Sequence, residues 1–132
     1  MNLPRGHMED GVGESMHMQG IAHVLESGGV DRLGFGIIGF DDDYLVRVYN
    51  RTESVVAGLS PERVMGFHLF DSIAPCMNNF LVAQRFQDAV AQGLALDDTI
   101  SYVLTLRMRP TPVKLRLLAL PALRYRYVLV ER

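Results

Sequence analysis

The chain holds a single cysteine, Cys76, and a free cysteine can form a covalent bond to a ligand. Its thiolate reacts with an activated acyl group and holds it as a thioester. One cysteine excludes an internal disulfide and gives no cysteine cluster for zinc. Free cysteine is also among the most buried residue types and often only packs in a core. The surrounding sequence must therefore decide between a reactive and a packing cysteine.

Tyr49 and Glu53 lie upstream of Cys76, one helical turn apart in the sequence, and together could bind a buried anion. The tyrosine hydroxyl donates a hydrogen bond, and a glutamic acid donates one only when protonated. Burial beside another negative charge favours that protonated form. Hydrogen bonds from O–H groups to an anionic oxygen are short and strong. The ordinary interpretations are a half-buried core tyrosine and a solvated surface acid.

The order of predicted elements gives an α+β domain with a five-stranded antiparallel sheet. Alternating apolar and polar residues indicate strands, and apolar residues at helical spacing indicate helices. Glycine, proline and aspartate mark the turns, including three consecutive aspartates at 41–43. Strands are expected over 33–40, 44–49, 99–108, 113–120 and 124–130, and helices over 21–26, 52–57, 61–65 and 79–92.

Capping signals set the expected helix ends. Asn50 and Ser60 are predicted to be the N-caps of two short helices, which stop at Gly58 and Gly66. The longest helix is predicted to begin at Asn79. Its apolar stripe is expected to consist of Val82, Phe86, Ala89 and Val90.

Composition excludes several classes of function. The 132 residues fit one domain, and a net charge of -2 argues against nucleic acid as a partner. No apolar run approaches the roughly 20 residues that span a bilayer, so no membrane segment is expected. The first 20 residues have no apolar stretch typical of a secretory signal. A free thiol suits a reducing compartment, and we therefore expect a cytoplasmic protein.

Other charged residues give no second site. The four histidines have no metal-ligand spacing, and His68 is expected to be a satisfied side chain beside Phe67. A cysteine-nucleophile enzyme would need a base and an orienting group near Cys76, and no such pair is evident, so we do not expect an enzyme. A mild basic stripe is expected to face water on alternate strand positions; it consists of Arg107, Arg109, Lys114 and Arg116.

Five segments resemble the photoactive yellow protein (xanthopsin) family of PAS-fold domains in order and spacing. The resemblance covers Asp31 to Arg132 without large gaps. Its most specific part is Ala-Pro-Cys, ending at Cys76, downstream of a Tyr-Asn-x-x-Glu segment. The matching segments are 34–38, 49–53, 60–66, 70–76 and 108–114.

The resemblance implies a blue-light photoreceptor with p-coumaric acid (4-hydroxycinnamic acid) held as a covalent thioester on Cys76. Tyr49 and Glu53 match residues that hydrogen-bond the far end of that chromophore, and Tyr102 and Met108 match residues near its ring. Isomerisation would move the phenolate away from its donors, and a proton from Glu53 would neutralise it. A buried, unpaired carboxylate would remain, and structural relaxation would let water reach it.

Three positions depart from the family pattern. Ala57 replaces a threonine that supports the tyrosine, Leu59 replaces an arginine that covers the pocket, and Leu104 replaces an aromatic lining residue. These changes keep an apolar pocket and remove polar support. They leave open an alternative: a non-photoactive PAS-type ligand-binding or dimerisation module.

The resemblance also implies a domain organisation. Short helices are expected on one face of the sheet, with an N-terminal helical cap. Residues 1–30 are expected to form a mobile arm and cap helix, and residues 31–132 the PAS domain. Light would loosen the N-terminal segment and signal to an unknown downstream protein. If the domain forms a homodimer, the N-terminal helix is its natural interface.

Overall fold

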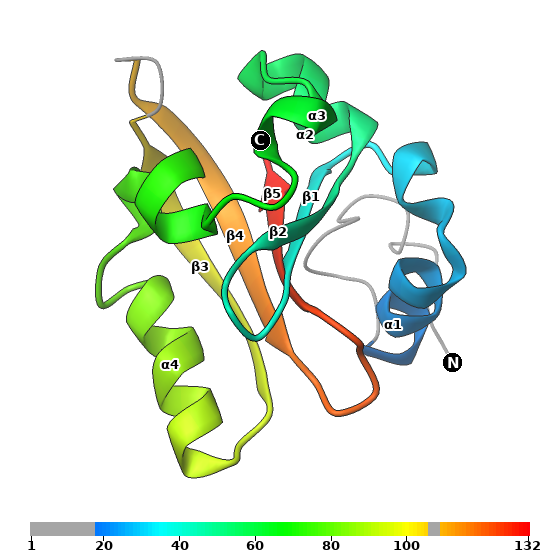
Figure 1. Ribbon diagram of the computed structural model, residues 1–132, viewed down its shortest axis with the longest axis vertical. Helices are drawn as coiled ribbons and strands as arrows, with labels where there is room; N and C mark the ends of the chain where they lie inside the picture. The colour runs from blue at the N-terminus through cyan, green and yellow to red at the C-terminus, as the bar shows by residue number, and fades with distance from the viewer. Residues whose placement is uncertain (1–17, 106–108) are drawn as a thin grey trace, which may run out of the picture.

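A five-stranded antiparallel sheet forms the centre of the domain, as predicted. The computed structural model describes residues 18–105 and 109–132 (Figure 1). The strands follow the order β2-β1-β5-β4-β3, so β5 at the end of the chain pairs between β1 and β4. Their bounds are β1 Gly36–Phe40, β2 Val46–Tyr49, β3 Leu96–Leu104, β4 Thr111–Ala119 and β5 Arg126–Glu131.

Helices cover both faces of this sheet. In Figure 1, α1 lies on one side of the sheet and α4 on the other. No helix of the described part is long and apolar enough to cross a membrane. The elements are α1 Met18–Ser27, α2 Arg51–Ala57, α3 Pro61–Val64 and α4 Ala83–Gln92, with shorter turns η2 Gly29–Arg32, η3 Leu69–Ile73 and η4 Pro75–Met77.

Two separate cores result, because successive strand residues point to opposite faces of the sheet. On β1, Ile37 packs in the smaller core beneath α1, and the next residue, Ile38, packs in the larger core beneath the other helices. Ile21 and Leu25, one turn apart on α1, are buried in the smaller core. The predicted N-terminal cap helix is therefore present and covers the sheet. Burial on both faces explains why β1 is apolar throughout.

The larger core contains a cluster of aromatic rings. The ring of Phe40 on β1 lies 5.6 Å from that of Phe70 and 4.9 Å from that of Phe86, both edge to face. Phe86 and Val82 are fully buried, as the predicted stripe of the longest helix requires. The prediction that Val90 belongs to this stripe is wrong, because Val90 lies near the end of α4 with half of its surface exposed.

Side-chain hydrogen bonds confirm some of the local predictions and contradict others. The aspartate turn is confirmed, since Asp41 Oδ1 accepts from the backbone N–H groups of Asp43 (2.9 Å) and Leu45 (3.0 Å). Ser60 precedes α3, but its side chain makes no capping bond. Helix α4 begins at Ala83, four residues later than predicted. Residues 80–82 form a turn instead, and Asn79 Oδ1 accepts from the N–H groups of the two residues before the helix, Leu81 and Val82.

The hairpin of β3 and β4 corrects the predicted basic stripe. Arg116 on β4 is only 6% exposed, so it does not face water as expected. Its guanidinium donates two hydrogen bonds to Asp97, from Nε to Oδ1 (2.9 Å) and from Nη2 to Oδ2 (3.0 Å). Strand β3 begins at Leu96, three residues earlier than predicted, because residues 96–98 pair with residues 117–119 of β4. Arg107 of the stripe lies outside the described residues.

Candidate functional site

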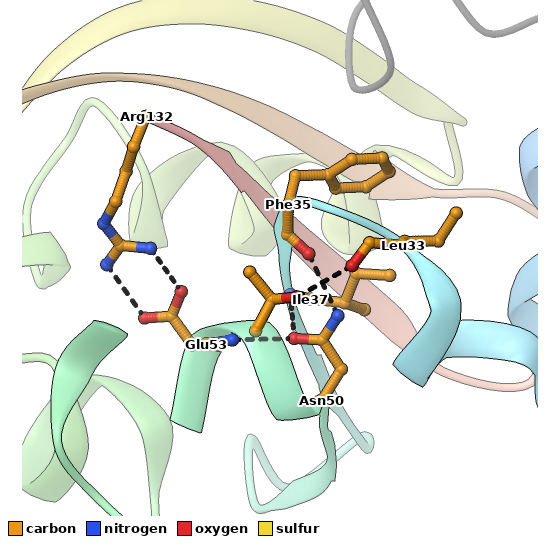
Figure 2. Close-up of polar contacts among 7 residues, drawn as sticks. Leu33, Phe35, Ile37, Asn50, Glu53 and Arg132 are labelled. Carbon is orange, nitrogen blue, oxygen red and sulfur yellow. Dashed lines mark hydrogen bonds and ion pairs between the residues drawn. The ribbon is translucent and has the colours of Figure 1, made fainter. Parts of the chain in front are cut away.

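Asn50 anchors helix α2 to the sheet. Its side chain is fully buried, and Oδ1 accepts from the backbone N–H of Glu53 (3.0 Å), which confirms the predicted N-cap. Oδ1 also accepts from Ile37 N–H on β1 (2.9 Å) (Figure 2). Its Nδ2 donates to the carbonyls of Phe35 and Val30, both at 2.9 Å. One amide thus joins α2, β1 and η2, a role that the sequence did not predict.

Glu53 is buried on the inner side of α2 with 2% of its surface exposed. It lies against Gly36 of β1, where a β-carbon would collide with its carboxyl oxygen and lie 3.1 Å from its carboxyl carbon. The absence of a side chain at Gly36 therefore makes room for the acid. Burial excludes the interpretation of Glu53 as a solvated surface residue.

Arg132 is the ionic partner of Glu53 and was not predicted. Its guanidinium donates from Nη1 to Oε1 (2.8 Å) and from Nη2 to Oε2 (3.2 Å), a two-pronged arrangement (Figure 2). This geometry matches the planar fork of arginine to a carboxylate. The only signal in the sequence is a cation after an apolar strand, which does not indicate a partner 79 residues away.

Tyr49 is the last residue of β2 and is 6% exposed. Within residues 18–105 and 109–132, its hydroxyl has no hydrogen-bond partner. Burial raises the pKa of Tyr49 to about 12, and the negative charge of Glu53 adds to the rise while Arg132 opposes it. The phenol therefore stays neutral at ordinary pH and keeps an unused donor inside the protein. A buried hydroxyl without a partner destabilises the fold unless a ligand accepts its hydrogen bond.

Cys76 lies in η4 with a free, half-buried thiol. Its backbone carbonyl accepts from the Tyr102 hydroxyl on β3 (2.5 Å) and from Asn79 Nδ2 (3.2 Å). Asn79 Nδ2 also donates to the Tyr102 hydroxyl oxygen (2.7 Å). These bonds fix the backbone that carries the thiol against the sheet. Tyr102 thus supports the backbone of Cys76, and its expected place near the chromophore ring stays a prediction.

The larger core brings most of the predicted site residues together. Tyr49 and Leu104 belong to this core, and Leu59, Cys76 and Tyr102 pack against it. Two further predicted site residues, Glu53 and Ala57, lie one helical turn apart on α2, and both are buried. Met108 lies outside the described residues.

These residues fit a flat acyl group with an ionisable oxygen at its far end. The thiol of Cys76 could hold the acyl carbon, and the unpartnered hydroxyl of Tyr49 could donate to that oxygen. The described ranges contain no group of three or more His, Cys, Asp or Glu side chains that could hold a metal ion. The predicted histidine interpretation also agrees, since His68 Nδ1 accepts from the N–H groups of Phe70 and Asp71 and caps η3.

Comparison with known proteins defines the class first. The family model described as the PAS fold matches residues 30–129. Solved domains of low identity share this fold, including a domain of the sensory box sensor histidine kinase/response regulator from Geobacter sulfurreducens. It is 12% identical with a TM-score of 0.60, and the match covers 81% of this chain and 94% of that one. The chain is therefore a PAS-fold domain.

More similar relatives define the family within that class. The photoactive yellow protein of Rhodothalassium salexigens is 36% identical over 88 residues, which are 67% of this chain and 70% of the relative. That of Halochromatium salexigens is 34% identical over the same shares. The photoactive yellow protein domain of the sensor histidine kinase Ppr from Rhodospirillum centenum is 31% identical with a TM-score of 0.76. That match covers 84% of this chain and 99% of the domain. The chain belongs to the photoactive yellow protein family.

Proposed function

We propose that this protein is a blue-light photoreceptor that holds p-coumaric acid as a thioester on Cys76. The observation that supports it best is that one core includes a buried Tyr49, whose hydroxyl has no hydrogen-bond partner among the described residues, and has the free, half-buried Cys76 packed against it. Family membership supports the same chromophore class. We propose a sensory role without catalysis, in the cytoplasm.

Each site residue has a distinct task in this proposal. When bound, the chromophore supplies visible absorption, a double bond that isomerises and a phenol that ionises. Cys76 would lose its thiol proton to solvent, and its thiolate would displace the leaving group of an activated acyl donor, such as the thiolate of a thiophenyl ester, so that the acyl carbon is held through the Cys76 sulfur. Tyr49 donates its O–H, and Glu53 donates when it carries a proton. Lining by apolar side chains excludes water; the proposed lining residues are Ala57, Leu59, Tyr102, Leu104 and Met108.

Loss of the Glu53 proton provides the driving force for a structural change. A carboxylate at this depth without a partner is strongly disfavoured, so the surroundings relax until water or a cation reaches it. Strand β1 connects this event to the opposite face. Ile38 packs in the core that holds the site, and its neighbour Ile37 packs beneath α1. We propose that residues 1–30 act as the releasable arm and cap of a PAS domain spanning 31–132. An unknown signalling protein or a homodimer partner would read the change.

A specific observation favours a second candidate, a non-photoactive PAS-type binding or dimerisation module. Arg132 already satisfies the Glu53 carboxylate, and Ala57 and Leu59 offer no polar support. Such a domain would keep the fold and bind another ligand or only another protein.

A visible absorption spectrum separates the two candidates. The purified apoprotein would be mixed with the thiophenyl ester of p-coumaric acid, beside Cys76→Ala as control. We expect a band in the blue that bleaches under illumination and is absent from the control. An intact circular dichroism spectrum with no band would refute the photoreceptor proposal and favour the second candidate.

A further inference from the structure

The ion pair between Glu53 and Arg132 is unequal in its access to water. The Glu53 side chain is 3% exposed, and the Arg132 side chain is 23% exposed. A buried carboxylate that loses its cation becomes an uncompensated charge, whereas an arginine near the surface can turn its head group to water. If this pair opens, Arg132 is therefore the residue that leaves.

The surroundings of Arg132 give it room to leave. It follows β5 and lines an open hollow of about 220 Å³ together with Gly34, Gly36 and Val56. Two of these neighbours are glycines, and because they have no side chains the guanidinium has room to turn toward solvent. Glu53 has no such path, because Gly36 and the inner side of α2 enclose it.

Several charged or ionisable groups meet at this point. Glu53 on α2 is the anion, Arg132 after β5 is the cation, and Tyr49 on β2 is a neutral phenol. Glu131, the last residue of β5, is an acid that also lines the hollow, whereas Gly36 on β1 brings no charge. A phenolate added beside Glu53 would place two anions close together, which is strongly disfavoured in a buried site unless one takes up a proton.

We propose that Glu53 exchanges partners when the chromophore binds. Arg132 holds Glu53 as a carboxylate in the apoprotein. On loading, the guanidinium turns to solvent, Glu53 takes up a proton from solvent, and the acid then donates to the phenolic oxygen. Arg132 is thus a positioning residue that sets the protonation state of Glu53. This inference rests on the proposed function.

Infrared spectroscopy of the apoprotein tests the first half without any chromophore. A protonated carboxylic acid has a carbonyl stretch that a carboxylate lacks, and Glu53→Gln would assign it. We expect no Glu53 acid band in the wild-type apoprotein, an acid band in Arg132→Gln, and none in Arg132→Lys, which keeps the cation. Arg47→Gln is the matched control, because Arg47 also pairs with a carboxylate at 2.8 Å but at a more exposed site. It should leave the Glu53 signal unchanged.

Loading tests the second half. With the thiophenyl ester, the wild type should gain the Glu53 acid band and take up about one more proton per molecule than Arg132→Gln. An acid band already present in the wild-type apoprotein, or absent from folded Arg132→Gln, would overturn the exchange even if a blue band forms. If the apoprotein bands behave as expected but no blue band forms in any variant, the proposed function fails. The exchange fails with it, and Arg132 is then only a structural counter-ion.

Discussion

The amide of Asn50 should contribute a large part of the stability of the domain. Asn50→Ala removes four hydrogen bonds at once, two accepted by Oδ1 and two donated by Nδ2. The groups left behind are the N–H groups of Ile37 and Glu53 and the carbonyls of Phe35 and Val30. Three of the four bonds are fully buried, so water does not readily replace them.

The structure gives the size of this effect. A buried polar group left without a partner destabilises a protein by roughly 1–3 kcal/mol. Taking the lower end for the three fully buried bonds gives a loss of at least about 3 kcal/mol for Asn50→Ala. Small domains have a free energy of unfolding of roughly 5–15 kcal/mol, so the variant should be folded but weak, or partly unfolded. Helix α2 should loosen first, since it loses both its cap and its tie to β1.

Urea denaturation followed by circular dichroism measures this loss. Asn78→Ala is the matched control, because Asn78 is exposed and makes one long bond to Asp71 (3.3 Å). It should change the free energy of unfolding by less than about 0.5 kcal/mol. A loss below about 1 kcal/mol for Asn50→Ala, or a loss equal to that of the control, would show that Asn50 does not anchor α2.

Three further variants test the site. Gly36→Ala should displace the Glu53 carboxyl and destabilise the apoprotein by about 1–3 kcal/mol in urea; an unchanged midpoint would contradict the close packing. Wild-type stability should fall between pH 10 and 12, because burial raises the pKa of both Tyr49 and Tyr127 to about 12 in the folded protein, and both ionise more readily when unfolded. Tyr49→Phe should remove its share of that fall, leave the share of Tyr127 and cost nothing at pH 7; an equally steep fall would refute the burial argument. Tyr102→Phe removes the donor to the Cys76 carbonyl and should cost about 1 kcal/mol in thermal or urea unfolding; no loss would mean that the bond is unimportant.

Regular elements could be predicted from the sequence because their signals are local. The cap at Asn50 and the stop at Gly58 fix α2 within a residue, and the structure has α2 at Arg51–Ala57. The start of α4 could not be predicted in this way. Asn79 has a helix-capping side chain, and the structure uses it to form a turn and to bind the carbonyl of Cys76 instead. The Asn79 side chain would accept from the same two backbone N–H groups, those of Leu81 and Val82, as a helix cap or in this turn. The position of η4, which carries the Cys76 carbonyl, decides between the two conformations.

The candidate site likewise contains residues that the local sequence indicates and residues whose roles depend on distant parts of the chain. Cys76, Tyr49 and Glu53 could be selected from the sequence because their types suit one chemistry and their order resembles the photoactive yellow protein family, and their joint role stays a prediction. The second role of Asn50 depends on Phe35 and Val30, 15 and 20 residues away, and on the path of the chain before β1. Burial of Arg116 depends on its cross-strand carboxylate at Asp97 in the same manner. Alternation along one strand predicts which face a residue takes, but not whether that face is covered.

Arg132 shows why an acid cannot be assigned a protonation state from its own position. Burial generally disfavours the charged form of a carboxyl group, and a nearby anion disfavours it further. A cation that donates one hydrogen bond to each carboxyl oxygen has the opposite effect. Here that cation is Arg132, which follows β5, the central strand of the sheet. The same three groups can therefore hold the proton on Glu53 or leave it in solvent, depending on where the guanidinium lies. Because Arg132 reaches water and Glu53 does not, the partner exchange that we propose begins at the more exposed residue.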